Sequence, residues 1–393
     1  NNSISQNGAI TLAANTNAVS VVTYDATSGN YLSNITAAAI TTTSGSTYAV
    51  NYSVISAGSA ISVAAIAVPG SVTIDNTYGS ASGAKSSGYF NGTNNSSSNV
   101  TTSSGVLVGG VNLAGTSLTI KGVGSSGWGI QNSSAYALTA TNGDITLVGV
   151  GPDGIYQMGS LYAAAGSIDM SSVSTSSVWS YYAQNGSQQN YIALNNINLA
   201  SYAVTYSSAV NIQNVLMRTT NGDITLSARG GINSNGAVSQ VLYMAGVVVK
   251  AGQNFTIQGA ALTNGIAVAS ASSAVTTTAG FIAVDVRTSG SWAYGGITSV
   301  GYKAAGAISI SGTSGSSYGI YSNSAIESTA GSVTMTGTST SGYGTYIDTS
   351  GTVTAVTGIA IYGRGAAGSV TTIGLIKSTG TTGGIILNAA TDA

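Results

Sequence analysis

The most regular feature of this chain is a short phrase in which large apolar residues alternate with small polar ones. A small turn residue and Gly come first, followed by any residue, Ile or Val, any residue, and Leu, Ile or Met. Alternation with a period of two predicts a β-strand that buries one face. Copies with some drift lie at residues 7–14, 58–65, 69–76, 115–122, 142–149, 165–172, 221–228, 252–259, 279–286, 305–312, 330–337, 367–374 and 382–389.

The phrase recurs at a nearly constant interval. Between Gly115 and Gly331 most of the leading glycines are separated by about 25 residues. The one interval of double length, between Gly166 and Gly222, contains YIALNNINL at 191–199, which we interpret as a degenerate copy. A fixed period with a strand-like core is the sequence signature of a stacked solenoid.

Two further strand signals lie between the phrases. One is an aromatic-Gly-Ile motif, and the other is a short alternation, Ala-Ile-Glu-Ser, at 325–328. Three short strands in about 25 residues, joined by Gly, Ser and Asn turns, predict one turn of a parallel β-helix. Copies of the aromatic motif, the last two looser than the others, lie at 128–130, 153–156, 318–321, 343–346 and 358–362.

The predicted fold is therefore all-β, a right-handed parallel β-helix (β-solenoid) with about three short strands per turn. The alternation also predicts which side chains face the core. They are Ile145, Leu147, Ile168, Met170, Ile224, Leu226, Ile308, Ile310, Val333 and Met335.

The domain organisation expected from this pattern is a single β-solenoid over residues 1–393. No linker divides the chain, and the core of a solenoid grows along one axis without the usual size limit. Residues 76–104 are poor in apolar side chains, so we expect an insertion or lateral loop there. Because the chain opens on Asn1 with no signal peptide, we expect a processed product or a piece of something longer.

Charge is scarce along the whole chain. Only 5% of the residues are charged, there is no His, and the net charge is −1, whereas a soluble domain usually carries about 25% charged residues. Near-neutral surfaces tend to associate. The lack of a cluster of Lys and Arg predicts no nucleic-acid binding, and no apolar run approaches the ~18 residues of a membrane span.

Candidate chemistry is limited to carboxylates. Without His or Cys, the chain has no imidazole or thiolate for the usual triads or zinc sites. Asp144 and Asp223 share an Asn-Gly-Asp phrase about three turns, or roughly 14 Å, apart, and we interpret them as turn residues that accept backbone N–H groups. Asp153 and Asp169 could lie on neighbouring turns, where Asp169 faces solvent on a strand, and we favour structural or incidental roles for this pair. We predict no catalytic, cofactor-binding or metal-binding residue and no enzymatic activity.

Tyrosine is the dominant aromatic residue, with 22 Tyr against three Phe and three Trp. Its apolar ring and polar tip suit a contact surface, so one reading is an adhesive or packing stripe of stacked rings. The alternative is simple β-propensity with half-burial at corners. The residues considered for the stripe are Tyr181, Tyr182, Tyr191, Tyr318, Tyr321, Tyr343 and Tyr346.

The repeated phrases NGDITL, at 142–147 and 221–226, and AGSVTMTG, at 330–337, resemble those of filamentous-haemagglutinin-like adhesins and autotransporter passenger domains of Gram-negative bacteria. The resemblance covers most of the chain. It implies a secreted β-helical protein with an adhesive or structural role, and it carries no catalytic residue over to this sequence.

Three classes of function follow from these observations. We expect a non-enzymatic extracellular or cell-surface structural rod, without cofactors, that self-associates into a fibre, sheath or layer. Its partners are then copies of itself. The first alternative is an adhesin stalk that binds cell-surface glycans or proteins of a host or neighbouring cell. The second is a polysaccharide-active β-helix enzyme or phage tailspike, which needs a groove lined with acids and bases.

Overall fold

A computed structural model describes the strands of this chain and many of their connections. The described residues are 4–5, 10–12, 18–22, 35–37, 40–42, 51–55, 61–63, 66–67, 72–76, 88–91, 106–109, 113–123, 128–132, 137–175, 179–183, 187–203, 208–230, 240–261, 266–288, 300–381 and 383–390. Throughout these ranges the regular elements are β-strands and no helix occurs.

The chain divides into two compact units, which we describe separately. The N-terminal unit comprises Asn1–Ser176, Ser180–Asn185 and Gln189–Leu194, and the C-terminal unit comprises Ser177–Trp179, Gly186–Gln188 and Asn195–Ala393. Within each unit the strands pair in parallel, each with the equivalent strand of the next turn. Both units are therefore parallel β-solenoids, as the sequence predicts.

Three kinds of sheet run along the N-terminal unit. The long-strand sheet contains, in order, β3 (Ala18–Val22), β6 (Asn51–Ile55), β9 (Val72–Asn76), β13 (Leu118–Val123), β16 (Ile145–Gly151) and β19 (Ile168–Ser174). The short-strand sheet contains β2 (Ile10–Leu12), β5 (Ile40–Thr42), β8 (Ile66–Ala67), β12 (Leu113–Gly115), β15 (Leu138–Ala140), β18 (Leu161–Ala163) and β21 (Gln189–Ala193). The aromatic sheet contains β10 (Gly88–Asn91), β11 (Val106–Gly109), β14 (Trp128–Asn132), β17 (Asp153–Gln157) and β20 (Trp179–Ala183), and β1 (Ile4–Ser5), β4 (Ile35–Ala37) and β7 (Ile61–Val63) form a separate small sheet.

The C-terminal unit repeats this arrangement. Its long-strand sheet contains β22 (Ile197–Ala203), β25 (Ile224–Gly230), β28 (Phe255–Ala261), β31 (Ile282–Thr288), β33 (Ile308–Ser314), β36 (Ser332–Ser339), β39 (Gly358–Gly365) and β42 (Ile385–Ala390). Its short-strand sheet contains β24 (Val215–Thr219), β27 (Val248–Ala251), β30 (Ser273–Thr277), β32 (Val300–Ala304), β35 (Ala325–Ser328), β38 (Thr352–Ala355) and β41 (Leu375–Ser378). Its aromatic sheet has two parts, which are β23 (Ser208–Gln213), β26 (Gln240–Ala245) and β29 (Ile266–Ala271), and then β34 (Tyr318–Ser322), β37 (Tyr343–Ile347) and β40 (Gly368–Thr372).

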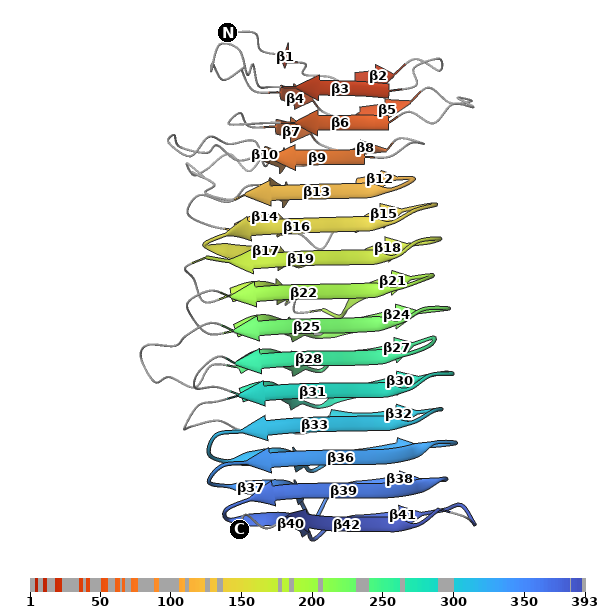
Figure 1. Ribbon diagram of the computed structural model, residues 1–393. Coiled ribbons are helices and arrows are strands. Elements are labelled where there is room, and N and C mark those ends of the chain that lie inside the picture. The colour runs from red at the N-terminus through yellow and green to blue at the C-terminus, as the bar shows by residue number, and fades with distance from the viewer. Residues whose placement is uncertain are drawn as a thin grey trace. The chain divides into compact units, whose positions relative to one another are not determined.

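The winding within each unit is right-handed. In Figure 1 the long strands run from right to left, successive turns descend, and the chain returns behind the long-strand sheet through the other two sheets. One turn thus passes through a long strand, an aromatic-sheet strand and a short strand, which confirms the predicted three strands per turn.

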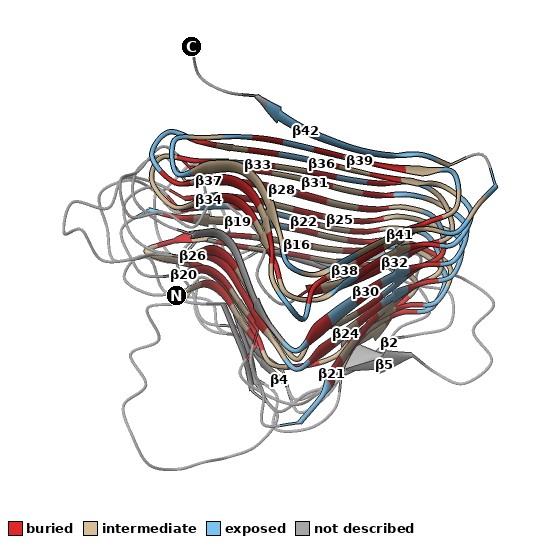
Figure 2. Ribbon diagram, turned by 90° about the horizontal axis from the view of Figure 1, so that it is seen from below, coloured by how far each residue is buried: buried red, intermediate tan, exposed pale blue. Residues whose placement is uncertain are grey.

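The core consists of columns of apolar side chains that point inward from the three sheets. β16 alternates strictly between buried and half-buried residues, and Ile145 stacks on Ile168 of the next turn. In Figure 2 buried residues, coloured red, recur along the strands of all three sheets. All ten predicted core residues have exposed fractions of 2% or less, namely Ile145, Leu147, Ile168, Met170, Ile224, Leu226, Ile308, Ile310, Val333 and Met335.

The repeated phrase does not always lie in the same sheet. The copy at 7–14 contains β2 of the short-strand sheet, the copy at 58–65 contains β7, and the copy at 367–374 contains β40 of the aromatic sheet. Conversely, residues 358–362, which we read as a loose aromatic motif, begin the long strand β39. That reading was wrong because strands of all three sheets share one alternation.

The expected insertion at 76–104 contains one described strand. β10 (Gly88–Asn91) pairs in parallel with β11, so this part of the segment belongs to the aromatic sheet. Residues 77–87 and 92–104 of the expected insertion lie outside the described residues.

Glycine in the aromatic-Gly-Ile motif has a packing role. A β-carbon on Gly319 would lie 2.6 Å from the carbonyl oxygen of Gly344 and even closer to the Thr338 amide nitrogen. Gly344 is confined in the same way by backbone atoms of the adjacent strands, and Gly154 is confined by the Ser172 hydroxyl and the Ser180 carbonyl oxygen. The aromatic sheet thus approaches the long-strand sheet backbone to backbone, and only glycine leaves room for this.

Candidate functional site

Asp144 and Asp223 lie at the corners that lead into long strands. Asp144 Oδ1 accepts a hydrogen bond from the Ser167 amide at 2.7 Å. Asp223 Oδ1 accepts from the Asn254 amide at 2.9 Å and from its side-chain nitrogen at 3.0 Å. These bonds confirm the interpretation of both residues as turn residues that bind backbone N–H groups.

In the C-terminal unit this corner forms a ladder from turn to turn. The Asp223 amide donates to Asn196 Oδ1 at 2.9 Å, and the Phe281 amide donates to Asn254 Oδ1 at 3.0 Å. Asn196, Asp223 and Asn254 therefore occupy equivalent positions and each binds the next turn. The Asp223 carboxylate satisfies backbone donors here and has a structural role.

Asp153 and Asp169 lie on neighbouring turns of the N-terminal unit, with Asp153 just after the end of the long strand β16 and Asp169 near the start of the long strand β19. Asp153 follows Gly151 closely, and Gly151 pairs with Ser174 on the next turn. Asp169 precedes Ser174 by five residues, which corresponds to about 16 Å along a strand. Glycosidase carboxylates act within about 10 Å of each other, so these two do not form such a pair.

Other features that would indicate chemistry or membrane insertion are missing from the part of the chain that the structure describes. It contains no cluster of three or more acidic side chains suited to a metal ion. It also contains no helix of the length and apolarity that crossing a membrane requires.

The tyrosines divide into surface clusters and core residues. In the N-terminal unit Tyr156 and Tyr182 stack with ring centroids 5.5 Å apart and an interplanar angle of 17°, and Trp128 lies 5.2 Å from Tyr156. All three rings are half-buried on the aromatic sheet. The stripe considered from the sequence did not include Trp128 or Tyr156. Their positions in the aromatic-Gly-Ile motif were the signal that could have placed both rings in the cluster.

The reading of a surface stripe does not hold for Tyr181 and Tyr191, which are fully buried in the core. The Tyr181 hydroxyl donates to the Tyr191 hydroxyl at 3.0 Å, and Tyr191 donates to Gln189 Oε1 at 3.2 Å. Burial raises the pKa of both phenols. Tyr181 neighbours Tyr182 on one strand, so the period-two alternation places the two rings on opposite faces.

The C-terminal unit carries a cluster of four tyrosines on β34 and β37. Tyr318 stacks on Tyr343, and Tyr321 stacks on Tyr346, at centroid distances of 5.5 and 5.7 Å and interplanar angles of 13° and 5°. The Tyr321 hydroxyl donates to Asp348 Oδ2 at 2.6 Å. This bond raises the pKa of Tyr321 to about 12 and lowers the pKa of Asp348. The predicted stack is confirmed for these four residues, which we call the tyrosine quartet.

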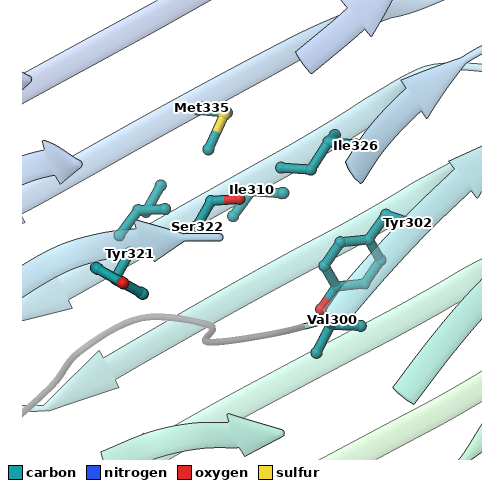
Figure 3. Close-up of a pocket in the computed structure, with 8 residues that line it drawn as sticks. Val300, Tyr302, Ile310, Tyr321, Ser322, Ile326 and Met335 are labelled. Carbon is teal, nitrogen blue, oxygen red and sulfur yellow. The ribbon is translucent and has the colours of Figure 1, made fainter. Parts of the chain in front are cut away.

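Tyr302 occupies a small apolar pocket in the core of the C-terminal unit. Its ring is 2% exposed, and its hydroxyl has no hydrogen-bond partner among the described residues. In Figure 3 the oxygen is directed toward Val300 on the same strand. The space is at the lower limit for one water molecule, and the lining is Val300, Tyr302, Ile310, Ile320, Tyr321, Ser322, Ile326 and Met335.

We predict that Tyr302→Phe leaves the free energy of unfolding unchanged or raises it by up to about 1 kcal/mol, because it removes an unpaired buried hydroxyl. The matched variant Tyr191→Phe is expected to lower it by about 1–2 kcal/mol, because the Tyr181 hydroxyl and Gln189 lose their shared partner. Urea unfolding followed by far-UV circular dichroism measures both. Equal losses for the two variants would show that the Tyr302 hydroxyl is bonded.

The short-strand sheet of the C-terminal unit concentrates cations in one outward-facing column. Four of the nine Lys and Arg residues of the chain lie there. Lys303 Nζ binds Glu327 Oε2 of the next turn at 3.0 Å, whereas Arg218 and Lys250 are exposed and directly opposed. In strand order the column is Arg218, Lys250, Thr276, Lys303, Glu327, Thr354 and Lys377. We call it the cation column.

The opposed Arg218 and Lys250 predict a measurable electrostatic effect. Lys250→Glu is expected to raise the free energy of unfolding by about 0.2–1 kcal/mol, because an opposite-charge pair replaces a like-charge pair. Lys303→Glu should lower it, since it breaks the ion pair with Glu327. Thermal unfolding at ~10 mM and ~1 M NaCl provides the check, and both effects should shrink at high salt. Persistence of either effect at ~1 M NaCl would contradict the electrostatic explanation.

No protein-family model matches the chain, and no curated protein matches it either.

Proposed function

We propose that this chain is a non-enzymatic structural solenoid of the cell exterior that self-associates end to end. The observation that carries the proposal is the last described turn of the C-terminal unit. Its strands β40, β41 and β42 each pair with one neighbour only among the described strands. Unpaired N–H and C=O groups on such an edge form a template for a further strand layer.

Several large apolar side chains of this turn are open to solvent. β42 is pale blue, and therefore exposed, in Figure 2. Ile385 and Leu387 continue the buried column of Ile359 and Ile361. Large exposed residues on the turn, with exposed fractions from 45% to 59%, are Ile373, Leu375, Ile385, Ile386 and Leu387. A layer that covers this edge must present parallel strands with the same inward apolar columns.

For the 393-residue chain by itself, we propose that a second copy supplies such a layer. Its strands follow the same three-strand course, so stacking would extend the core columns and hydrogen-bond ladders across the junction. Low charge along the chain also leaves little repulsion between copies. Because the contact rests on backbone pairing and apolar burial, we expect it to be insensitive to salt.

The test is light scattering and electron microscopy of the purified chain from ~10 mM to ~1 M NaCl, over which screening shortens from ~30 Å to ~3 Å. Assemblies are expected throughout. The double variant Leu375→Lys/Leu387→Lys places charges on the open turn and should remain monomeric. Phe281→Lys, at another exposed apolar position, should assemble like the parent. A parent that stays monomeric, or a double variant that assembles normally, would refute end-to-end stacking.

Adhesion is the second candidate function, and the cation column favours it. Exposed Arg218 and Lys250 repel each other in the free protein. An anionic group that bridges them relieves this repulsion, so its electrostatic binding energy is larger than at an isolated cation. The partner would be an acidic cell-surface glycan. Binding of a polyuronate, measured by calorimetry at low salt, should be lost in Arg218→Gln/Lys250→Gln and kept in Arg364→Gln, on the long-strand sheet.

The family proposal rests on the repeated phrases together with the fold. A parallel β-solenoid is compatible with filamentous-haemagglutinin-like adhesins and autotransporter passenger domains, and both NGDITL copies include the start of a long strand. We place the chain in this group as a proposal, with export to the cell surface as its consequence.

The absence of enzymatic activity is also a proposal. Turnover of a polyuronate that is abolished by Asp153→Asn or Asp169→Asn would contradict it.

A further inference from the structure

The tyrosine quartet places two phenol rings in register on adjacent turns. Tyr321 pairs with Tyr346 in the strand register of β34 and β37. Their rings are nearly parallel, at 5°, with centroids 5.7 Å apart. Both side chains are half-buried on the outer face, so a small oxidant in solution can reach them. The strand register therefore holds the two phenol rings as direct neighbours on the same face of the sheet.

The carboxylate of Asp348 adds a proton acceptor to this pair. One-electron oxidation of a phenol requires loss of the hydroxyl proton, and the Tyr321 hydroxyl already donates to Asp348 Oδ2 at 2.6 Å. The Asp348 carboxylate is held in place by the Thr349 amide, which donates to Oδ1 at 2.7 Å. Since the pKa of Asp348 is lowered, the carboxylate is ionised at neutral pH and free to accept that proton.

We propose that Tyr321 and Tyr346 are an oxidative modification site, at which a one-electron oxidant of the peroxidase class joins β34 and β37 through a dityrosine bond. This inference is independent of the proposed self-association. The chain has no Cys, so a disulfide cannot link its turns, whereas a bond between two tyrosines can.

Each phenol gives up one electron to the oxidant and one proton, which passes to Asp348 at Tyr321 and to solvent at Tyr346. The two phenoxyl radicals form one carbon–carbon bond between ortho positions, and the hydrogen on each coupled carbon moves to the phenol oxygen as the rings regain aromaticity. Two electrons and two protons leave in total, and hydrogen peroxide takes them up to form two molecules of water.

The link would close a loop between successive turns of the C-terminal unit. A cross-link of this kind lowers the conformational entropy of the unfolded chain. We therefore expect oxidised protein to unfold at a higher urea concentration than the untreated protein, and the shift should be missing in Tyr346→Phe.

The experiment treats the full chain with a haem peroxidase and hydrogen peroxide. Glu327 is the single Glu of the sequence and lies between the two tyrosines. Digestion with trypsin and a glutamate-specific protease therefore separates residues 304–327 from 328–364. Mass spectrometry should find these two peptides joined with the loss of two hydrogen atoms, and fragmentation should place the bond at Tyr321 and Tyr346.

Conservative variants test what Tyr321, Tyr346 and Asp348 each contribute to forming the link. Tyr321→Phe and Tyr346→Phe are expected to abolish the joined peptide, with unchanged far-UV circular dichroism as evidence that each variant folds. Tyr362→Phe is the matched control, because Tyr362 lies in the same peptide and is exposed, and it should leave the yield unchanged. Asp348→Asn keeps an acceptor oxygen but removes the base, so it should slow formation of the link.

Mixing isotopically labelled and unlabelled protein before oxidation separates two kinds of product. A link within one chain gives no peptide of mixed label, and its yield does not depend on protein concentration. Peptides of mixed label, a bond at Tyr318 and Tyr343 without one at Tyr321 and Tyr346, or no joined peptide at all would each overturn the proposal. An Asp348→Asn variant that couples at the parent rate would remove Asp348 from it.

Discussion

Ile224→Asp is expected to lower the free energy of unfolding by about 3–5 kcal/mol, because it buries an unpaired carboxylate and leaves a cavity. Ile224 is fully buried in the centre of a column, in register with Ile197 and Phe255 of the adjacent turns. No cation lies on the inward face of these strands to pair with the new charge. Urea unfolding followed by circular dichroism measures the loss.

The matched control for this variant is Ser227→Asp. Ser227 lies on the same strand but on the outward face, where it is half-buried. A carboxylate there keeps its hydration, so we expect a change within about 0.5 kcal/mol. Similar losses for the two variants would contradict the inward facing of Ile224, on which the whole column assignment depends.

Gly319→Ala is expected to cost about 3 kcal/mol or more, even though it adds a single methyl group. The added β-carbon would meet the Gly344 carbonyl oxygen at 2.6 Å and lie still closer to the Thr338 amide nitrogen. Both neighbours are backbone atoms in ladders, so neither can move without breaking hydrogen bonds, and overpacking of this kind destabilises strongly.

The same substitution at Gly301 provides the control with the opposite expectation. A β-carbon on Gly301 meets only the Ala325 carbonyl oxygen, at an ordinary distance of 3.8 Å. Gly301→Ala should therefore raise the free energy of unfolding by up to about 1 kcal/mol, since alanine loses less backbone entropy on folding. If thermal unfolding finds both alanine variants equally tolerated, the close approach of the two sheets is not as described.

The sequence alone determined the fold class and the inward face of the strands. Alternation with a period of two and a repeat of about 25 residues are local properties, and stacking equivalent turns converts them directly into buried columns such as Ile145 on Ile168. The roles of Asp144 and Asp223 were also predictable, because an Asx side chain in a turn binds nearby backbone donors whatever lies further away.

Only the tertiary structure decided which sheet each phrase joins and which residues meet across turns. All three faces carry the same alternation, so nothing local distinguishes β40 of the aromatic sheet from a long strand. The separation of Asp153 from Asp169, the burial of Tyr191, the hydrogen bond from Tyr321 to Asp348 and the cation column all depend on the register between turns. That register follows from the lengths of the corners, because each added corner residue shifts which side chains of successive turns come into contact.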